Sequence, residues 1–371
     1  MSSFRTLRAL CLSLLLAGCG DDVPIKIGLV GPFAEPRATS MRIAAELAVE
    51  EINAAGGLRG RPVELVVLDD SGQAAGAVAA AQQLVADPSV VAVVGHLTSG
   101  ATLAAAPTYR GTRPVAVVSP SASSPLLTDA GPWMFRVCPA DAVHGVRLAA
   151  WAKERLGARR AAVLYINDDY GRGLRDVFVE AFTGAGGEVV TLDPYLDDLP
   201  SFRPYLERLR RRGGADVLLI AGTRTGAARI LATRDSLGLD FPVIGGDGIV
   251  GVEQIGAAAE GVFISTAYLS EAPGAANAAF VRAYRTASGN RLPDHRGAGA
   301  YDAVHLIARA VEAVGTGRED IRDYLARVGT SKPAYDGVTG RVAFDEHGDV
   351  PEKSTVMGVV RNGALRVVEG S

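Results

Sequence analysis

Two short segments rich in hydroxyl side chains carry the clearest chemical signal in this chain. They are Gly95-His-Leu-Thr-Ser-Gly-Ala-Thr102 and Ser119-Pro-Ser-Ala-Ser-Ser-Pro125. The first follows the apolar run 90–94, and helix-forming sequence begins within it at Ala101. Free N–H groups at the start of a helix, beside Ser and Thr hydroxyls, favour an anion. Taken alone, both segments are explained equally well as helix caps, because Ser and Thr are common capping residues.

The elements that must position these segments form a repeated α/β pattern. Apolar, β-rich runs alternate with Ala-rich helical stretches, which is typical of βαβ units and parallel sheets. The alternation runs through two similar blocks, roughly 24–138 and 142–266, and the length of 371 residues also suggests two domains. The carboxyl edge of such a sheet would hold both hydroxyl segments, and open α/β sheets bind ligands there.

The first eighteen residues predict export. Arg5 and Arg8 form a basic start, and the apolar stretch 9–16 is shorter than the roughly 20 residues that span a bilayer. Leu16-Ala-Gly18 directly before Cys19 resembles the cleavage site of bacterial lipoproteins. We therefore expect a signal peptide over 1–18, a lipidated Cys19 and a short tether over 19–23 that holds the protein at a membrane. An ordinary signal peptide with an incidental Cys is the alternative.

Composition and motifs argue against several classes of function. Loss of Arg5 and Arg8 with the signal lowers the 38 basic residues to 36, against 41 acidic ones, so the net charge falls from −3 to −5. Nucleic acid is therefore not expected as a partner. Cys138 would remain without a pairing Cys, and the five histidines show no metal-binding spacing. No nucleophile motif or phosphate-binding loop appears either, so we expect no enzyme, cofactor or metal.

A glycine pattern keeps one enzymatic alternative open. Gly246-Asp-Gly-Ile-Val-Gly251 matches G-x-G-x-x-G and follows the strand-like run 241–245. A dinucleotide site also requires a full helix after the glycines and an acidic residue about 20 positions further on, at a strand end. Here the following segment is short and broken by glycine, and Glu271 stands in a loop-like stretch. A nucleotide-dependent enzyme is therefore the less favoured alternative.

Several segments occur together in one order over nearly the whole mature chain. They resemble, in sequence and order, the periplasmic branched-chain amino-acid-binding proteins (the Leu/Ile/Val-binding family), which are solute receptors of ABC importers. The matching segments are Ile25-Lys-Ile-Gly-Leu-Val-Gly-Pro32, Ala48-Val-Glu-Glu-Ile-Asn-Ala-Ala-Gly-Gly57, Gly60-Arg-Pro-Val-Glu-Leu-Val-Val-Leu-Asp-Asp70, Gly95-His-Leu-Thr-Ser99, Ser119-Pro-Ser-Ala-Ser123, Asp169-Tyr-Gly171, Tyr335-Asp-Gly-Val-Thr-Gly340 and Phe344-Asp-Glu-His-Gly348.

The resemblance implies the type I periplasmic-binding-protein fold, with two doubly wound α/β lobes joined by three crossovers. Lobe 1 would comprise 24–139 and 270–338, and lobe 2 would comprise 140–269 and 339–371. A monomer would close on a small ligand and deliver it to the permease subunits of an ABC transporter. A sensory or regulatory domain of the same fold is the alternative.

The family's binding residues carry over to seven positions. The first lobe would hold the α-carboxylate and α-ammonium of an amino acid through its two hydroxyl loops, and the second lobe would add an aromatic residue and an acid. The residues are Thr98, Ser99, Ser121 and Ser123 from lobe 1, and Tyr170, Thr223 and Asp247 from lobe 2.

This chain departs from the family where the ligand's side chain would lie. The loop 33–40 lacks the family's usual Ser, Gly and Tyr residues, and Thr223 stands where an aromatic is usual. The acid Asp247 replaces a Glu, and Gly72 and Thr98 occupy the positions of the family's frequent disulfide. Leucine-type specificity therefore does not follow, and we expect a small amino acid or a related carboxylate or amide.

Overall fold

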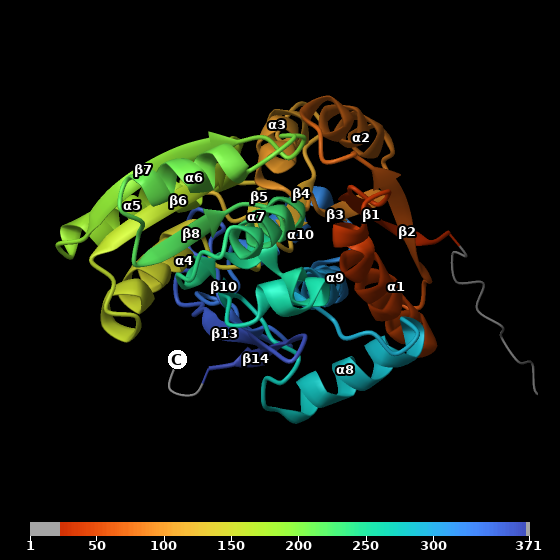
Figure 1. Ribbon diagram of the computed structural model, residues 1–371. Helices are drawn as coiled ribbons and strands as arrows, with labels where there is room; N and C mark the ends of the chain where they lie inside the picture. Colours follow the sequence, from red (N-terminus) through yellow and green to blue (C-terminus); the bar gives the residue numbers. More distant parts are fainter. Residues whose placement is uncertain (1–22, 369–371) are drawn as a thin grey trace, which may run out of the picture.

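The computed structural model describes residues 23–368 of the chain. The predicted signal peptide and the predicted lipidation site Cys19 lie outside these residues. In the described range, no helix has both the length and the apolar character needed to cross a membrane. Two sheets, each with helices on both faces, form two lobes that lie side by side (Figure 1). The predicted α/β class with two mainly parallel sheets is confirmed.

The first sheet has five parallel strands in the order β2-β1-β3-β4-β5. Its inner strands are continuous apolar runs because helices cover both faces, and every residue of β3 and β4 is buried. The strands are β1 (Ile25–Gly31), β2 (Val63–Asp69), β3 (Val90–Val94), β4 (Ala116–Ser119) and β5 (Met134–Arg136).

The second sheet has seven strands in the order β14-β13-β10-β9-β8-β6-β7. The strands β6 to β10 are parallel, whereas β13 and β14 join one edge in antiparallel orientation. The α/β alternation did not predict these two edge strands, because their segment is short and rich in turn residues. The strands are β6 (Arg160–Ile166), β7 (Glu188–Tyr195), β8 (Val217–Ala221), β9 (Val243–Gly245), β10 (Phe263–Thr266), β13 (Val356–Arg361) and β14 (Ala364–Val367).

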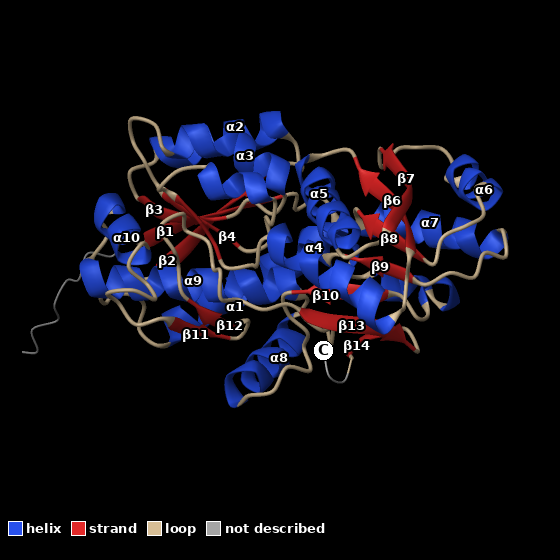
Figure 2. Ribbon diagram, turned by 90° about the vertical axis from the view of Figure 1, so that its left-hand side faces the viewer, coloured by secondary structure: helices blue, strands red, loops and turns tan. Residues whose placement is uncertain are grey.

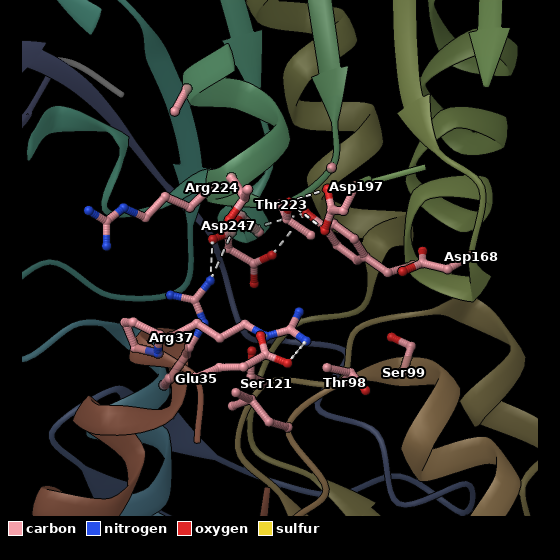
Figure 3. Close-up of a pocket in the computed structure, with 18 of the residues that line it drawn as sticks. Glu35, Arg37, Thr98, Ser99, Ser121, Asp168, Asp197, Thr223, Arg224 and Asp247 are labelled. Atoms are coloured by element: carbon pink, nitrogen blue, oxygen red, sulfur yellow. Dashed lines mark hydrogen bonds and ion pairs between the residues drawn. The ribbon is translucent and has the colours of Figure 1, made fainter. Parts of the chain in front are cut away.

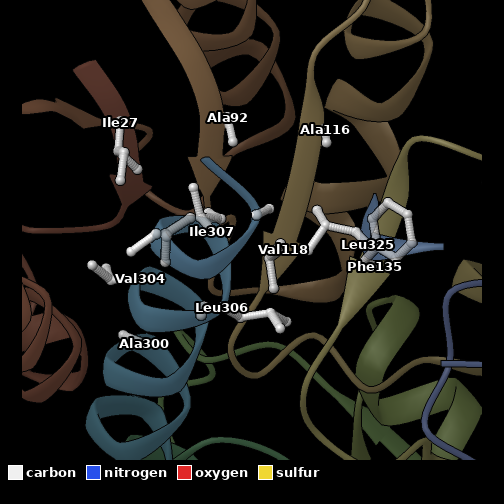
Figure 4. Close-up of a cluster of buried hydrophobic side chains, with 14 of the residues drawn as sticks. Ile27, Ala92, Ala116, Val118, Phe135, Ala300, Val304, Leu306, Ile307 and Leu325 are labelled. Carbon is white, nitrogen blue, oxygen red and sulfur yellow. The ribbon is translucent and has the colours of Figure 1, made fainter. Parts of the chain in front are cut away.

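Helices on the two faces of the first sheet create two core layers (Figure 2). In α9, Ala300, Val304 and Ile307 recur at the spacing of one helix face and pack under the sheet (Figure 4). One face is covered by α1 (Thr39–Ala54), α9 (His295–Val314) and α10 (Arg318–Leu325), and the other by α2 (Ala74–Ala86) and α3 (Ser99–Tyr109).

The second sheet is covered in the same manner. Its helices are α4 (Asp141–Ala150) and α5 (Asp169–Gly184) on one face, and α6 (Arg203–Arg211) and α7 (Arg224–Ser236) on the other. The helix α8 (Ala275–Ala287) packs instead beside α1 of the first lobe.

The chain passes between the lobes after β5, after β10 and after a small hairpin of β11 (Tyr335–Gly337) and β12 (Gly340–Val342). Val342, Phe344 and Val350 belong to the core of the first lobe. The last crossing therefore lies beyond Val350, later than the boundary at residue 339 that the resemblance implied. Asp349 holds this segment in place by accepting two hydrogen bonds of 2.6 Å from the Arg136 guanidinium.

Candidate ligand-binding site

A cavity of about 480 Å³ lies where the carboxyl ends of the two sheets face each other. Loops that follow β3 and β4 line it from the first lobe, and loops that follow β6 to β9 line it from the second (Figure 3). This volume is in the usual range for a small-molecule site. Six of the seven residues expected at a site line the cavity: Thr98, Ser99, Ser121, Tyr170, Thr223 and Asp247.

The amino end of α3 forms part of the first-lobe wall. Thr98 caps this helix, and its hydroxyl accepts a hydrogen bond from the Ala101 N–H at 3.4 Å. Ser99 is the first helical residue, and its hydroxyl oxygen accepts from the Ser124 N–H at 3.2 Å. The backbone N–H groups of Ser99 and Gly100 have no acceptor inside the helix, as at any helix start. The wall thus presents hydrogen-bond donors and the positive end of a helix dipole.

The loop after β4 places its two predicted serines differently. The Ser121 hydroxyl lies on the cavity wall, 3.4 Å from Nε2 of His295. Ser123 is fully buried and is not part of the wall, and its hydroxyl has no partner within residues 23–368. Its carbonyl accepts from the Asp141 N–H at 2.7 Å, at the point where the chain enters the second lobe. Ser123 therefore stands one layer behind the cavity.

Tyr170 and Asp247 form the facing wall of the second lobe. The Tyr170 hydroxyl donates to Oδ1 of Asp247 at 3.2 Å and accepts from the Gly248 N–H at 3.0 Å. A Cβ atom at Gly246 would lie 2.7 Å from the Tyr170 hydroxyl, and one at Gly248 would lie 2.6 Å from the ring. Tyr170, together with Leu174 at Gly246 and the Gly222 carbonyl at Gly248, leaves no room for a side chain at either glycine.

The same segment lacks the helix that a dinucleotide site requires. Asp247–Ile249 and Val252–Ile255 are short 3₁₀ turns, separated by Gly251 in the left-handed region at φ 101°. No α-helix begins in this segment, so its glycines do not open a phosphate-binding helix.

Asp247 is a buried carboxylate with one free oxygen. Its side chain is 3% exposed, and Oδ2 has no hydrogen-bond partner in the described chain. Nε2 of His144 and Nε2 of His295 lie 3.8 and 3.7 Å from this oxygen. Burial lowers the pKa of His295 to about 4, and burial also lowers the pKa of His144. Both imidazoles are neutral at pH 7, so neither neutralises the carboxylate.

Arg296 links the two lobes across the cavity, and the sequence analysis missed it. Its guanidinium donates to Asp294 of the first lobe at 3.0 Å and to the carbonyls of Asp247 and Gly248 at 3.2 and 3.4 Å. The helix α9 begins at His295, directly after the cap residue Asp294. An Asp directly before a helical pattern is a start signal, and it would have placed Arg296 in the first turn.

Thr223 lies on the cavity wall, but its hydroxyl is already hydrogen-bonded to other groups of the protein. It caps α7 by accepting from the Gly226 N–H at 3.1 Å. Its hydroxyl proton is donated to the Asp197 carboxylate, with oxygen distances of 2.8 and 3.0 Å. Asp197, in the loop after β7, is a lining residue that the sequence analysis did not identify.

The shortened loop after β1 brings an ion pair to the cavity. Nε of Arg37 lies 2.7 Å from Oε2 of Glu35, and both residues line the wall. Figure 3 shows the Arg37 guanidinium extending toward Thr98. A Cβ at Gly72 would lie 2.7 Å from Nη2 of Arg37, so a glycine at this position makes room for the guanidinium.

Comparisons with known proteins agree with this architecture. A family model described as "Periplasmic binding protein" matches residues 24–364. The chain is 27% identical over 349 residues to Leu/Ile/Val-binding protein homolog 1 of Brucella abortus, covering 92% of this chain and 91% of that protein. It is 29% identical over 339 residues to the leucine-, isoleucine-, valine-, threonine- and alanine-binding protein of Pseudomonas aeruginosa, covering 88% and 87%.

Solved structures show the same similarity. The substrate-binding protein LivJ from Streptococcus pneumoniae, in complex with isoleucine, superposes with a TM-score of 0.84 at 29% identity, covering 93% of this chain and 99% of that one. A solute-binding protein from R. palustris, in complex with benzoate, gives 0.83 at 22% identity, covering 93% and 96%. The second likeness shows the fold alone.

Proposed function

This chain belongs to the periplasmic binding protein family, and from that premise we propose that its cavity captures an α-amino acid. It is an exported solute-binding protein that delivers a small ligand to an ABC transporter, and it is not an enzyme. Relatives from Brucella and Pseudomonas are named for amino acids, and the Streptococcus structure contains isoleucine. These names support an amino acid as the ligand class.

The observation that carries the proposal is the free oxygen of Asp247 opposite the amino end of α3. Oδ2 of Asp247 is buried without a donor, and across the cavity the N–H groups of Ser99 and Gly100 lack acceptors within the helix. A zwitterion satisfies both walls at once, since its ammonium donates to the carboxylate and its carboxylate accepts from the helix start. Either charge left unpaired in the closed cavity would cost several kcal/mol.

We assign the individual roles on the same basis. Ser99 and Ser121 would bind the ligand's α-carboxylate with hydroxyl and backbone donors. Tyr170 would orient Asp247, because its hydroxyl bonds both that carboxylate and the adjacent turn. Ligand between the two walls would favour closure of lobe 1 (24–139 and 270–350) on lobe 2 (140–269 and the segment after Val350).

Calorimetry on the processed protein, purified in detergent, tests this proposal. The twenty common amino acids are titrated first, and then two analogues of the best ligand, one without the ammonium and one without the carboxylate. We expect each analogue to bind at least about 100-fold more weakly, since each leaves one wall with an unpaired charge or donor. The absence of binding by every amino acid, or an analogue that binds as tightly as the best ligand, would overturn the proposal.

We also propose that a lipid on Cys19 holds one copy of the chain at the membrane. The basic, apolar and small-residue regions of the leader support this anchor. The cavity is lined by two lobes of a single chain, which supports a monomer as the working unit. Labelling cells with an alkyne-bearing fatty acid should tag the protein, and Cys19→Ala should abolish the tag and release the protein from membranes. A tag that persists in Cys19→Ala would contradict the anchor.

A further inference from the structure

The acidic side chains at the second-lobe end of the cavity indicate which kind of amino acid binds. We infer that the amino acid carries a positively charged side chain, an ammonium or a guanidinium, which Asp197 binds at the end of the cavity remote from the α-carboxylate. The inference rests on the proposed function, because the α-carboxylate and α-ammonium fix which end of the ligand reaches Asp197.

Asp197 is a carboxylate whose hydrogen-bonding capacity is largely unused. Both of its oxygens accept from the one hydroxyl of Thr223, and no cation of the described residues forms an ion pair with it. Two ionised carboxylate oxygens offer about four acceptor sites, so most of them remain open. Thr223 therefore holds a carboxylate acceptor in place on the cavity wall.

Two of the guanidinium groups that line the cavity are paired with acidic side chains of the protein. Arg37 pairs with Glu35, and Arg296 pairs with Asp294 and two carbonyls. Nη2 of Arg224 donates to the Gln254 side chain at 3.0 Å. Figure 3 shows that the Arg224 guanidinium extends away from Asp197.

Arg229 is the remaining cation, and it supports the backbone beneath the Asp197 carboxylate. Its guanidinium donates to the carbonyls of Asp197 and Leu199 and lies 5.3 Å from the centre of the Phe202 ring. None of the four lining arginines forms an ion pair with the Asp197 carboxylate, so its open acceptor sites can receive a donor-rich cation of the ligand.

A second carboxylate strengthens the negative potential at this end. Asp168 caps α5 by accepting from the Gly171 N–H at 2.8 Å, and it forms no ion pair with any described residue. Burial raises the pKa of Asp168, and the neighbouring carboxylates of Asp169 and Asp197 raise it further. A cation held between Asp168 and Asp197 would relieve this repulsion.

The rest of the cavity shows that these acids belong to a ligand site. Oδ2 of Asp247 lines the same cavity, almost fully buried and without a partner. One acid is therefore available for the α-ammonium, and Asp197 and Asp168 remain for a second cation. A cavity of about 480 Å³ also has room for a side chain of lysine or arginine length.

Pairs of ligands that differ in charge but not in shape test the inference. Arginine is compared with citrulline, and lysine with norleucine, by calorimetry on the processed protein. We expect the charged member of at least one pair to bind about 10- to 100-fold more tightly, as for a charge-assisted hydrogen bond. Raising NaCl from 20 to 500 mM should weaken that member's binding and leave its neutral partner nearly unchanged.

The variant Asp197→Asn assigns the effect to one residue. It keeps an oxygen that accepts from Thr223 and removes the charge, so the preference for the charged ligand should shrink about tenfold while the neutral isostere binds within about twofold. Asp198→Asn is the matched control, because Asp198 is exposed and does not line this cavity. If citrulline binds at least as tightly as arginine and norleucine binds at least as tightly as lysine, the inference is overturned and the proposed function is left intact. A lack of binding by any amino acid would overturn both.

Discussion

Replacing Asp247 with Asn should weaken ligand binding and stabilise the ligand-free protein at the same time. The substitution keeps the shape of the side chain and the acceptor for the Tyr170 hydroxyl at 3.2 Å. It removes a negative charge whose side chain is 3% exposed and whose Oδ2 lacks a donor within the described residues. Opposite effects on affinity and stability are expected because the charge is compensated only when a ligand ammonium is present.

The size of the loss in affinity follows from the burial of the pair. Removing one partner of a buried ion pair costs about 3–5 kcal/mol. The Asn side chain still offers an oxygen to the ammonium, so the lower end applies. A loss of about 3 kcal/mol corresponds to roughly a 150-fold rise in Kd.

The gain in stability has a different origin. Nδ1 of His144 is 3.0 Å from the Ser265 hydroxyl, which leaves Nε2 to face Asp247. The imidazole nitrogens of His144 and His295 lie 3.8 and 3.7 Å from Oδ2, beyond hydrogen-bond distance, so the gain comes from removing a buried charge that no donor compensates. Relief of an unsatisfied buried group is worth about 1–3 kcal/mol, and each kcal/mol raises Tm by about 2–4 °C for lobes of this size.

Calorimetric titration and thermal unfolding of the ligand-free protein measure the two effects separately. Asp176→Asn is the control, because that side chain on α5 is 67% exposed and does not line the cavity. It should change neither quantity. A Kd for Asp247→Asn within twofold of the unsubstituted protein would refute the claim that Asp247 binds the ligand's ammonium. A lowered Tm would refute the claim that its uncompensated charge destabilises the ligand-free protein.

Three further substitutions separate the remaining roles. Ser99→Ala should weaken ligand binding about 10-fold or more, and it also leaves the Ser124 N–H without an acceptor. Ser123 lies behind the cavity, so Ser123→Ala should change the Kd by no more than about threefold. Equal losses of affinity in the two variants would contradict this division. Arg296→Met should raise the ligand dissociation rate about tenfold in stopped flow, with partial recovery in Arg296→Lys, and an unchanged rate would show that the bond between lobes is dispensable. Asp141→Asn should raise Tm, and the difference from the unsubstituted protein should widen as the pH rises above 4. Parallel curves of Tm against pH for the two proteins would contradict this.

The sign of the Asp141 prediction follows from burial of its carboxyl group. Burial raises the pKa of Asp141 well above 3.8, and the neighbouring Asp247 charge adds to this shift. Above pH 4 the unfolded chain releases this proton while the folded protein retains it, so stability declines as the pH rises toward the folded-state pKa. Asn carries no such proton, so the stability of the Asp141→Asn variant does not show this decline with pH.

Much of the fold was predictable because the underlying signals are local. The apolar runs of β1, β3 and β8 and the glycines that end helices report burial and backbone conformation within a few residues. The edge strands β13 and β14 were missed because their segment is short and turn-rich, and pairing with β10 makes them strands. Arg296 was missed because its role depends on acceptors in the other lobe, the carbonyls of Asp247 and Gly248.

Local patterns and family motifs in the sequence were enough to predict the two α/β blocks, the hydroxyl-rich segments that contain Thr98 and Ser121, and the acid Asp247. The surroundings of the ligand became visible only in the folded chain. Asp197 becomes an open acceptor because Thr223 orients it and Arg229 is engaged by carbonyls. Such a balance depends on which donors and acceptors meet across distant loops, and no local periodicity encodes it.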